Sequence, residues 1–165
     1  MKRVFLGFFC LLPALLGACT IQTYTPVLTT AFAQKAIVET GGFSYSCEIC
    51  RTQDGAVSVT VSDTASAGMV MRCSGSGFAV SYDKIDQSMD FDKVNQNNAC
   101  LAVYRAFDAL ASSQQPNASK TETGYAFYGK TNLGRFTLVQ AQDGTLQSLS
   151  FPSAALQITF SAPEK

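Results

Sequence analysis

The sequence of 165 residues contains no histidine and no tryptophan. The absence of histidine excludes a Ser-His-Asp triad, histidine metal ligands and a histidine-ligated haem. Lysine plus arginine equals aspartate plus glutamate at 12 each, so the chain lacks the basic excess that binds nucleic acid phosphates. The sequence therefore excludes several enzyme classes and favours no nucleic acid partner, and its length fits one domain with a real core.

The first residues have the pattern of a bacterial export signal. Lys2 and Arg3 precede an uncharged apolar run from Val4 to Leu16, which is too short for a transmembrane helix. The run ends in Leu16-Gly17-Ala18-Cys19, which resembles a lipobox, where a signal peptidase cuts before the cysteine. We expect residues 1–18 to be a lipoprotein signal peptide and Cys19 to carry lipid, which would anchor an extracytoplasmic protein to a membrane. The alternative is an ordinary secretory signal cleaved near the same place.

The part of the chain after the signal divides into a spacer and a domain. Residues 19–34, rich in Thr, Gln and Ala, are expected to form the lipidated N-terminus and spacer, and residues 35–165 the folded domain. Residues 27–39 predict a short helix, although their apolar positions follow the helical period poorly.

Alternating apolar and polar residues predict eight strands in two consecutive meanders. Asp54-Gly55 in the first meander and Asp143-Gly144 in the second are preferred hairpin turns. The first meander comprises residues 43–49, 57–61, 69–74 and 78–82. The first strand of the second meander begins with Tyr125 and Phe127 and ends at a turn formed by Asn132-Leu133-Gly134. The other three cover residues 136–140, 146–151 and 155–160.

Residues 98–112 between the meanders carry apolar side chains at helical spacing, so they predict a helix that Asn97 or Asn98 would cap. Residues 83–98 and 112–121 are expected to be connections. Asp83, Asp86, Asp90 and Asp92 form an acidic cluster in the first of these, but it lacks the glycine and terminal glutamate of a calcium loop. The predicted fold class is α+β: a curved antiparallel sheet of about eight strands with one or two helices on its concave face.

Several short motifs occur in an order that resembles the LolA-like lipoproteins of Clostridia-type bacteria, the group that includes GerS-like spore-germination lipoproteins. They are Arg51-Thr52-Gln53-Asp54-Gly55, Gly68-Met69-Val70, Gly77-Phe78-Ala79-Val80-Ser81-Tyr82, Gly129-Lys130-Thr131-Asn132-Leu133-Gly134-Arg135-Phe136-Thr137-Leu138, Asp143-Gly144-Thr145-Leu146 and Ser148-Leu149-Ser150-Phe151-Pro152. The resemblance implies a half-barrel around a hydrophobic cavity. It also implies binding of an acyl chain, a lipoprotein or an envelope or sporulation partner protein, without catalysis or a cofactor.

An apolar floor is expected on the concave face of such a sheet. The helix at residues 98–112 can fill this floor as an ordinary core, and this interpretation is favoured for most of these residues because large apolar side chains usually lie in the core. A groove left open by the helix is the other interpretation. The candidates for lining a cavity are Phe43, Tyr45, Val59, Met69, Met71, Phe78, Val80, Tyr82, Phe127, Phe136 and Leu138.

Four cysteines remain in the body of the chain, namely Cys47, Cys50, Cys73 and Cys100. An even number in an exported domain favours two disulfides, with three connectivities open. Strand parity places Cys47, Cys73 and Cys100 under the helix, while Cys50 points the other way unless the strand ends or bulges at Ile49. We expect one bridge from the first strand to Cys73 or Cys100 and a second between the remaining pair. Free thiols, a redox-active Cys47-Glu48-Ile49-Cys50 motif and a four-cysteine zinc site are the alternatives.

Overall fold

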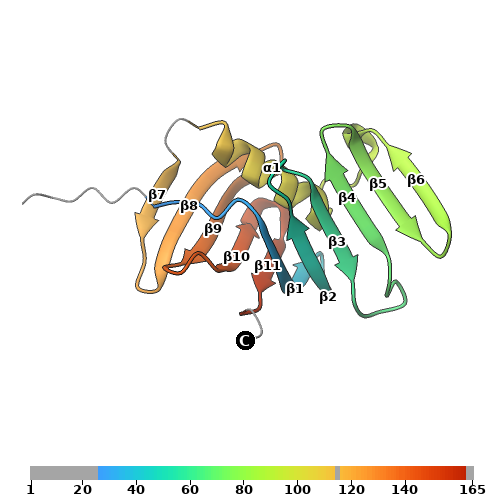
Figure 1. Ribbon diagram of the computed structural model, residues 1–165, viewed down its shortest axis with the longest axis horizontal. Coiled ribbons are helices and arrows are strands. Elements are labelled where there is room, and N and C mark those ends of the chain that lie inside the picture. Colours follow the sequence, from blue (N-terminus) through green and yellow to red (C-terminus); the bar gives the residue numbers. More distant parts are fainter. Residues whose placement is uncertain (1–25, 114–115, 163–165) are drawn as a thin grey trace, which may run out of the picture.

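The computed structural model describes residues 26–113 and 116–162. In these residues an antiparallel sheet of eleven strands curves around one α-helix, so the fold is α+β and the sheet is not closed into a barrel (Figure 1). The predicted signal peptide and Cys19 lie outside the described residues. Within the described residues, no helix is both long and apolar enough to cross a membrane.

The elements follow one another in the chain with short connections. In order they are β1 (Phe32–Thr40), β2 (Phe43–Arg51), β3 (Val57–Val61), β4 (Val70–Ser74), β5 (Gly77–Tyr82), β6 (Ile85–Met89), the 3₁₀ turn η1 (Phe91–Lys93), α1 (Ala99–Ala111), β7 (Asn117–Lys120), β8 (Gly124–Thr131), β9 (Gly134–Ala141), β10 (Leu146–Phe151), the 3₁₀ turn η2 (Pro152–Ala154) and β11 (Leu156–Phe160).

The sheet is built from two meanders that meet at its centre. The strand order is β6-β5-β4-β3-β2-β1-β11-β10-β9-β8-β7, and every neighbouring pair is antiparallel. The meanders are joined by β1 and β11, where Ala36 is opposite Phe160 and Val38 is opposite Ile158. The two edge strands, β6 and β7, flank α1 in the sequence, so the chain crosses the concave face from one edge to the other through the helix.

Glycine at positive φ closes two of the hairpins at the predicted turns. Gly55 between β2 and β3 and Gly144 between β9 and β10 both have φ +91°. A side chain is strained in this conformation, whereas glycine adopts it freely. Both Asp-Gly turns predicted from the sequence are therefore present.

The helix begins and ends close to the predicted positions. The side chain of Asn98 accepts a hydrogen bond from the backbone N–H of Leu101 at 3.2 Å, which caps the first turn. Ala99, Ala102 and Ala106 on the side facing the sheet are at most 1% exposed. These small residues let the helix backbone approach the sheet closely, and α1 packs against β3, β4 and β8.

The sheet has eleven strands where about eight were expected, so three strands were not predicted from the sequence. The helix predicted for residues 27–39 is wrong, since β1 occupies most of that range and begins at Phe32, within the predicted spacer. Residues 83–98 contain β6 and η1, and residues 112–121 contain β7. β6 and β7 are mostly exposed edge strands, which backbone pairing with β5 and β8 holds in place without an alternating apolar face.

The concave face carries the hydrophobic core and the opposite face is polar. Inward positions on the central strands are buried, as in Val38, Ile49 and Val59, each 0% exposed. Outward positions on β1, β2 and β4, such as Glu39, Glu48 and Arg72, are exposed. This two-sided pattern is typical of an antiparallel sheet with one face in water.

Candidate functional site

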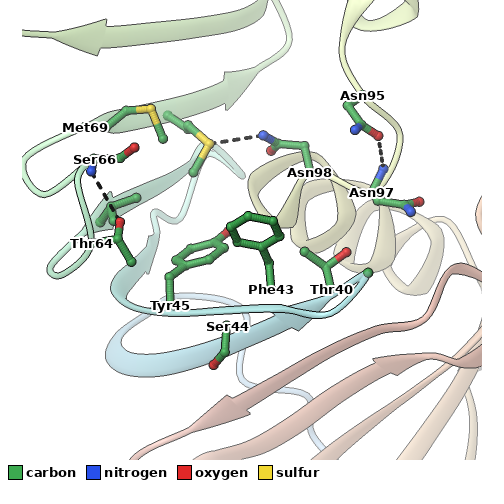
Figure 2. Close-up of a pocket in the computed structure, with 13 residues that line it drawn as sticks. Thr40, Phe43, Ser44, Tyr45, Thr64, Ser66, Met69, Asn95, Asn97 and Asn98 are labelled. Carbon is green, nitrogen blue, oxygen red and sulfur yellow. Dashed lines mark hydrogen bonds between the residues drawn. The ribbon is translucent and has the colours of Figure 1, made fainter.

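A pocket of about 520 Å³ opens beside the N-terminal end of α1 (Figure 2). It lies where the β1–β2 turn, the start of β2 and the β3–β4 connection approach the segment that leads into the helix. The residues lining it are Thr40, Gly41, Phe43, Ser44, Tyr45, Val61, Thr64, Ser66, Met69, Met71, Asn95, Asn97 and Asn98.

The floor of the pocket is apolar and partly aromatic. Phe43 and Tyr45 project from the same face of β2 because they are two residues apart, and Figure 2 shows both rings directed into the pocket. Phe43 is 77% exposed, whereas Met71 is only 4% exposed. The pocket thus runs from an exposed aromatic side chain at the mouth to a buried methionine at the helix.

Asparagine side chains and hydroxyl groups form the rim. The side-chain amide of Asn98 donates to the sulfur of Met71 at 3.1 Å, and the backbone N–H of Asn97 donates to Oδ1 of Asn95 at 3.0 Å. The backbone N–H of Ser66 donates to the hydroxyl of Thr64 at 3.3 Å. All the lining side chains are uncharged, so the pocket presents apolar surface and neutral hydrogen-bonding groups.

The ionisable group of Tyr45 stays neutral in this setting. Burial raises the pKa of the Tyr45 phenol well above its ordinary value, and the nearby Cys47 and Cys100 raise it further. The phenol is consequently a neutral hydrogen-bonding group over the physiological pH range and supplies no charge to the pocket.

The structure separates the predicted cavity residues into two groups. Phe43, Tyr45, Met69 and Met71 line the pocket. The others lie elsewhere: Tyr82 is 41% exposed, with its hydroxyl donating to the carbonyl of Ala65 at 2.9 Å, and Val80 is half-buried. Five belong to the packed core beneath and beside α1, namely Val59, Phe78, Phe127, Phe136 and Leu138.

Sequence reasoning missed the polar half of the pocket. From the sequence, Asn97 and Asn98 are expected only as a helix cap, Asn95 lies in the expected connection of residues 83–98, and Thr64 lies between two predicted strands. The signal that points to them is the density of asparagine just before a helix that covers an apolar face. It became interpretable only once the opposite wall, from β2 and β4, was known.

Two buried glutamines were also missed, and they hold the N-terminal segment against the sheet. Gln140 is 3% exposed; its amide donates to the carbonyl of Val27 at 2.9 Å and its oxygen accepts from the N–H of Thr29 at 2.8 Å. Gln34 is 8% exposed and bonds the backbone of Leu146. A polar residue at an inward position of a strand is the sequence signal for such a role.

The four body cysteines are free thiols in the structure, and they lie on both faces of the sheet. Cys47, Cys73 and Cys100 are at most 1% exposed and lie between sheet and helix. Cys50 follows Cys47 by three positions in β2, so its side chain points to the outer face. Burial, together with the charge of Asp63, raises the pKa of Cys47 to about 12.

This arrangement does not fit the expected pair of disulfides. Because Cys50 faces outward, it cannot reach any of the other three, and each two-disulfide connectivity requires it. Cys47 and Cys73 are on β2 and β4 with β3 between them, and their partners on β3, Val61 and Val57, are four residues apart, so their backbones lie far beyond the ~7 Å limit for a bridge. The expected bridge between the first strand and Cys73 therefore does not fit the register.

The same alternation bears on the redox and metal alternatives. Thiol oxidoreductases place a C-x-x-C motif at a helix N-terminus, whereas Cys47 and Cys50 are within one strand and on opposite faces. In the ranges 26–113 and 116–162, no group of three or more cysteine or acidic side chains is positioned to hold a metal ion. The acidic residues near η1 are exposed, and Lys93 pairs with Asp90 at 3.2 Å.

Comparison with protein-family models finds no match for this chain, and comparison with curated proteins finds none either. The resemblance to LolA-like and GerS-like lipoproteins therefore stays a prediction that rests on the motifs quoted above. The architecture at the coarser level, a large open antiparallel sheet with one helix, is what the structure establishes.

Proposed function

We propose that this protein is a membrane-anchored extracytoplasmic lipoprotein that binds a neutral hydrophobic ligand in the pocket beside the N-terminus of α1, without catalysing a reaction. The anchor is Cys19 of the predicted lipobox. The observation that carries the binding proposal is the pocket itself, of about 520 Å³, with Phe43 at its mouth and Tyr45, Met69 and Met71 along its floor.

The size and lining favour an acyl chain. Small-molecule sites commonly have volumes of roughly 300–1,000 Å³ and are lined mainly by apolar side chains with a few placed polar groups. Two methionines give the floor unbranched, adaptable side chains that suit a flexible chain. The rim offers amides and hydroxyls but no cation, so we propose a neutral ester or alcohol headgroup rather than a free carboxylate or phosphate.

A second candidate function is favoured by a different observation. Most of the concave face is packed core, while Phe43 and Ile85 are 77% and 68% exposed at separate places on the surface. Exposed large apolar side chains can mark a protein-binding surface. In this alternative the protein acts as an interaction lipoprotein for an envelope or sporulation partner, and the pocket receives an apolar side chain of that partner.

Native mass spectrometry of the full chain, purified in detergent from the membrane of an expressing bacterium, tests the first proposal. Acylation of Cys19 survives denaturation as added covalent mass, whereas a pocket ligand is lost on denaturation. Binding is then measured by titrating the delipidated chain with a monoacylglycerol. We expect a non-covalent lipid in the native spectrum and saturable binding in the titration.

Two variants separate pocket binding from adventitious adhesion. Phe43→Asp and Ile85→Asp each place a carboxylate at an exposed apolar position, but only Phe43 lines the pocket. We expect Phe43→Asp to weaken monoacylglycerol binding at least tenfold and Ile85→Asp to leave it unchanged. If no lipid is bound and the titration shows no saturable binding, the proposal of a ligand-binding pocket is wrong, and the alternative of an interaction lipoprotein remains.

A further inference from the structure

Two of the buried cysteines come from different layers of the fold and meet at one point. Cys73 lies in β4 with its side chain toward the helix, and Cys100 lies in the first turn of α1. Both are 0% exposed. We propose that Cys73 and Cys100 form a disulfide in the exported protein, which ties the N-terminal turn of α1 to the sheet.

Hydrogen bonds fix the position of the Cys100 thiol over the β3–β4 pair. Its Sγ donates to the carbonyl of Val57 at 3.4 Å and to that of Met71 at 3.6 Å. Val57 is the cross-strand partner of Cys73, and Met71 precedes Cys73 by two residues on the same strand. The Cys100 sulfur is therefore placed at the point of the sheet from which the Cys73 side chain emerges.

The packing of α1 permits the short backbone separation that a disulfide needs. A bridge requires Cα atoms about 4.4–6.8 Å apart, which is closer than most helix and sheet backbones approach. Ala99 and Ala102 are close to Cys100 on the helix and are at most 1% exposed, so small side chains lie beside Cys100 at the contact between helix and sheet. A hydrogen bond with the Cys73 side chain, followed by burial, also raises the pKa of Cys100, as expected for two thiols in contact.

The remaining cysteines cannot compete for this pairing in the folded state. Cys50 is on the outer face, and Cys47 is opposite Val61, four residues along β3 from Val57, which pairs with Cys73 and whose carbonyl lies beside the Cys100 sulfur. The structure therefore assigns a single bridge, and leaves Cys47 and Cys50 as thiols. This assignment differs from both bridges expected from the sequence.

The bond requires an oxidant, and burial decides when it can act. We take the oxidant to be a disulfide, either of a protein or of a small thiol. One cysteine thiolate attacks the oxidant disulfide and expels one thiol, giving a mixed disulfide. The second cysteine thiolate attacks that bond and expels the other thiol, so the two cysteines lose two protons and two electrons while the oxidant is reduced to two thiols. Since both sulfurs are inaccessible in the fold, the exchange must accompany folding.

The bridge would also act on the candidate pocket, and this consequence rests on the proposed function. Asn97 and Asn98 of the pocket rim are three and two residues before Cys100 in the sequence, and Met71 of the floor is two residues from Cys73. A covalent link at this position fixes the rim relative to the floor. Reduction would loosen one wall of the pocket without altering any lining residue.

Peptide mapping of the refolded full chain tests the bridge directly. The chain, purified in detergent, is unfolded with denaturant and reductant and refolded in a buffer containing reduced glutathione and glutathione disulfide. It is then denatured in N-ethylmaleimide and digested with trypsin. Cleavage after Arg72, Lys84, Lys93 and Arg105 places Cys73 and Cys100 in separate peptides, 73–84 and 94–105, while Cys47 and Cys50 share peptide 36–51.

We expect peptides 73–84 and 94–105 to be recovered as one linked species that separates on reduction, and peptide 36–51 to carry two maleimides. Recovery of both Cys73 and Cys100 as maleimide adducts, or linkage of either to peptide 36–51, would overturn the assignment. This readout needs no variant to fold. It is also independent of ligand binding, so the disulfide and the pocket can fail separately.

A stability comparison adds a second readout. We expect dithiothreitol to lower the urea midpoint of the oxidised protein, and to leave the midpoints of Cys73→Ser and Cys100→Ser unchanged. Cys50→Ser is the matched control and should keep the full dithiothreitol effect, because Cys50 is on the outer face. A dithiothreitol effect that persists in Cys100→Ser would contradict the assignment.

Discussion

Among the glutamines whose contacts at the sheet centre the structure gives, Gln34 should contribute most to the stability of the fold. A bulge shifts the register between β9 and β10 at Leu146 and Ser148, which leaves backbone groups of Leu146 available. The Gln34 amide donates to the carbonyl of Leu146 at 3.2 Å and its oxygen accepts from the N–H of Leu146 at 3.1 Å. A side chain of β1 thus completes the hydrogen bonding of a strand two positions away.

The expected loss can be worked out for Gln34→Leu, which keeps the volume of the side chain and removes its polar atoms. The N–H and the carbonyl of Leu146 would both lose a buried partner, and each unsatisfied group costs about 1–3 kcal/mol. The third bond, to the carbonyl of Ser161 at 3.1 Å, is only partly buried, so water can replace it. We therefore expect the free energy of unfolding to fall by about 2–6 kcal/mol.

Urea unfolding measures this loss, and an unchanged m-value would show that the denatured state is not the cause. Gln87→Leu is the matched control, because Gln87 is exposed on the edge strand β6. Surface substitutions of this kind change stability by about 0.5 kcal/mol or less. If Gln34→Leu cost no more than Gln87→Leu, the role assigned to the glutamine at the bulge would be wrong.

Three further predictions concern Phe107, the helix cap Asn98 and the buried thiol of Cys47. Phe107→Ala should lower the free energy of unfolding by about 3–5 kcal/mol, because the ring is 1% exposed, lies 5.5 Å from that of Phe32 and has the Arg51 guanidinium 5.0 Å above it. Urea unfolding checks this, and a loss below about 1 kcal/mol would refute the packing described. Asn98→Ala should cost about 1 kcal/mol through loss of the helix cap, and Asn98→Asp, which keeps an acceptor, should restore most of it. Equal losses in the two variants would remove the capping argument. The pKa of Cys47, raised by burial from 9.0 to about 12, means that the thiol favours the folded state fully below pH 9 and loses this contribution as the pH rises from 9 towards 12. Unfolding measured from pH 8 to 11 should show a shallower alkaline decline for Cys47→Ala than for the unmodified chain, and parallel declines would contradict the assignment.

The parts of the fold that were predictable are those in which one strand face is uniformly apolar. Val57, Val59 and Val61 alternate strictly with Ser58 and Thr60, and the strand was found where they indicated it. The helix was predictable because its apolar stripe is continuous and Asn98 supplies a cap.

The missed strands lack that signal for identifiable reasons. In β1 the inward positions include Gln34, and Ile37 points outward and is 46% exposed, so no clean alternation is visible. β6 is almost entirely exposed and is held by its backbone bonds to β5. β1 depends on its pairing with the distant β11 and β6 on its backbone pairing with β5, and the residues of either strand carry little information about that pairing.

Only the apolar half of the candidate site was predictable from the sequence. Its apolar floor followed from the alternation of Phe43 and Tyr45 and from Met69 and Met71, but the same reasoning included five residues that are packed core. Whether an apolar side chain faces the pocket or the core depends on the position of the N-terminal end of α1. The helix does not cover the start of β2, where Phe43 lies. The asparagine rim belongs to the segment entering the helix, so its relation to β2 is a tertiary contact.

The pairing of β1 with β11 has a consequence for how this protein reaches its final location. The strands at the centre of the sheet come from the two ends of the domain, and Ala36 meets Phe160. The middle of the structure therefore cannot form until the last strand has been synthesised, and topologies rich in such distant contacts fold slowly. The join between the two meanders therefore forms only after the whole domain has been made, which would suit the proposed export, because passage through a protein-conducting channel requires an unfolded chain.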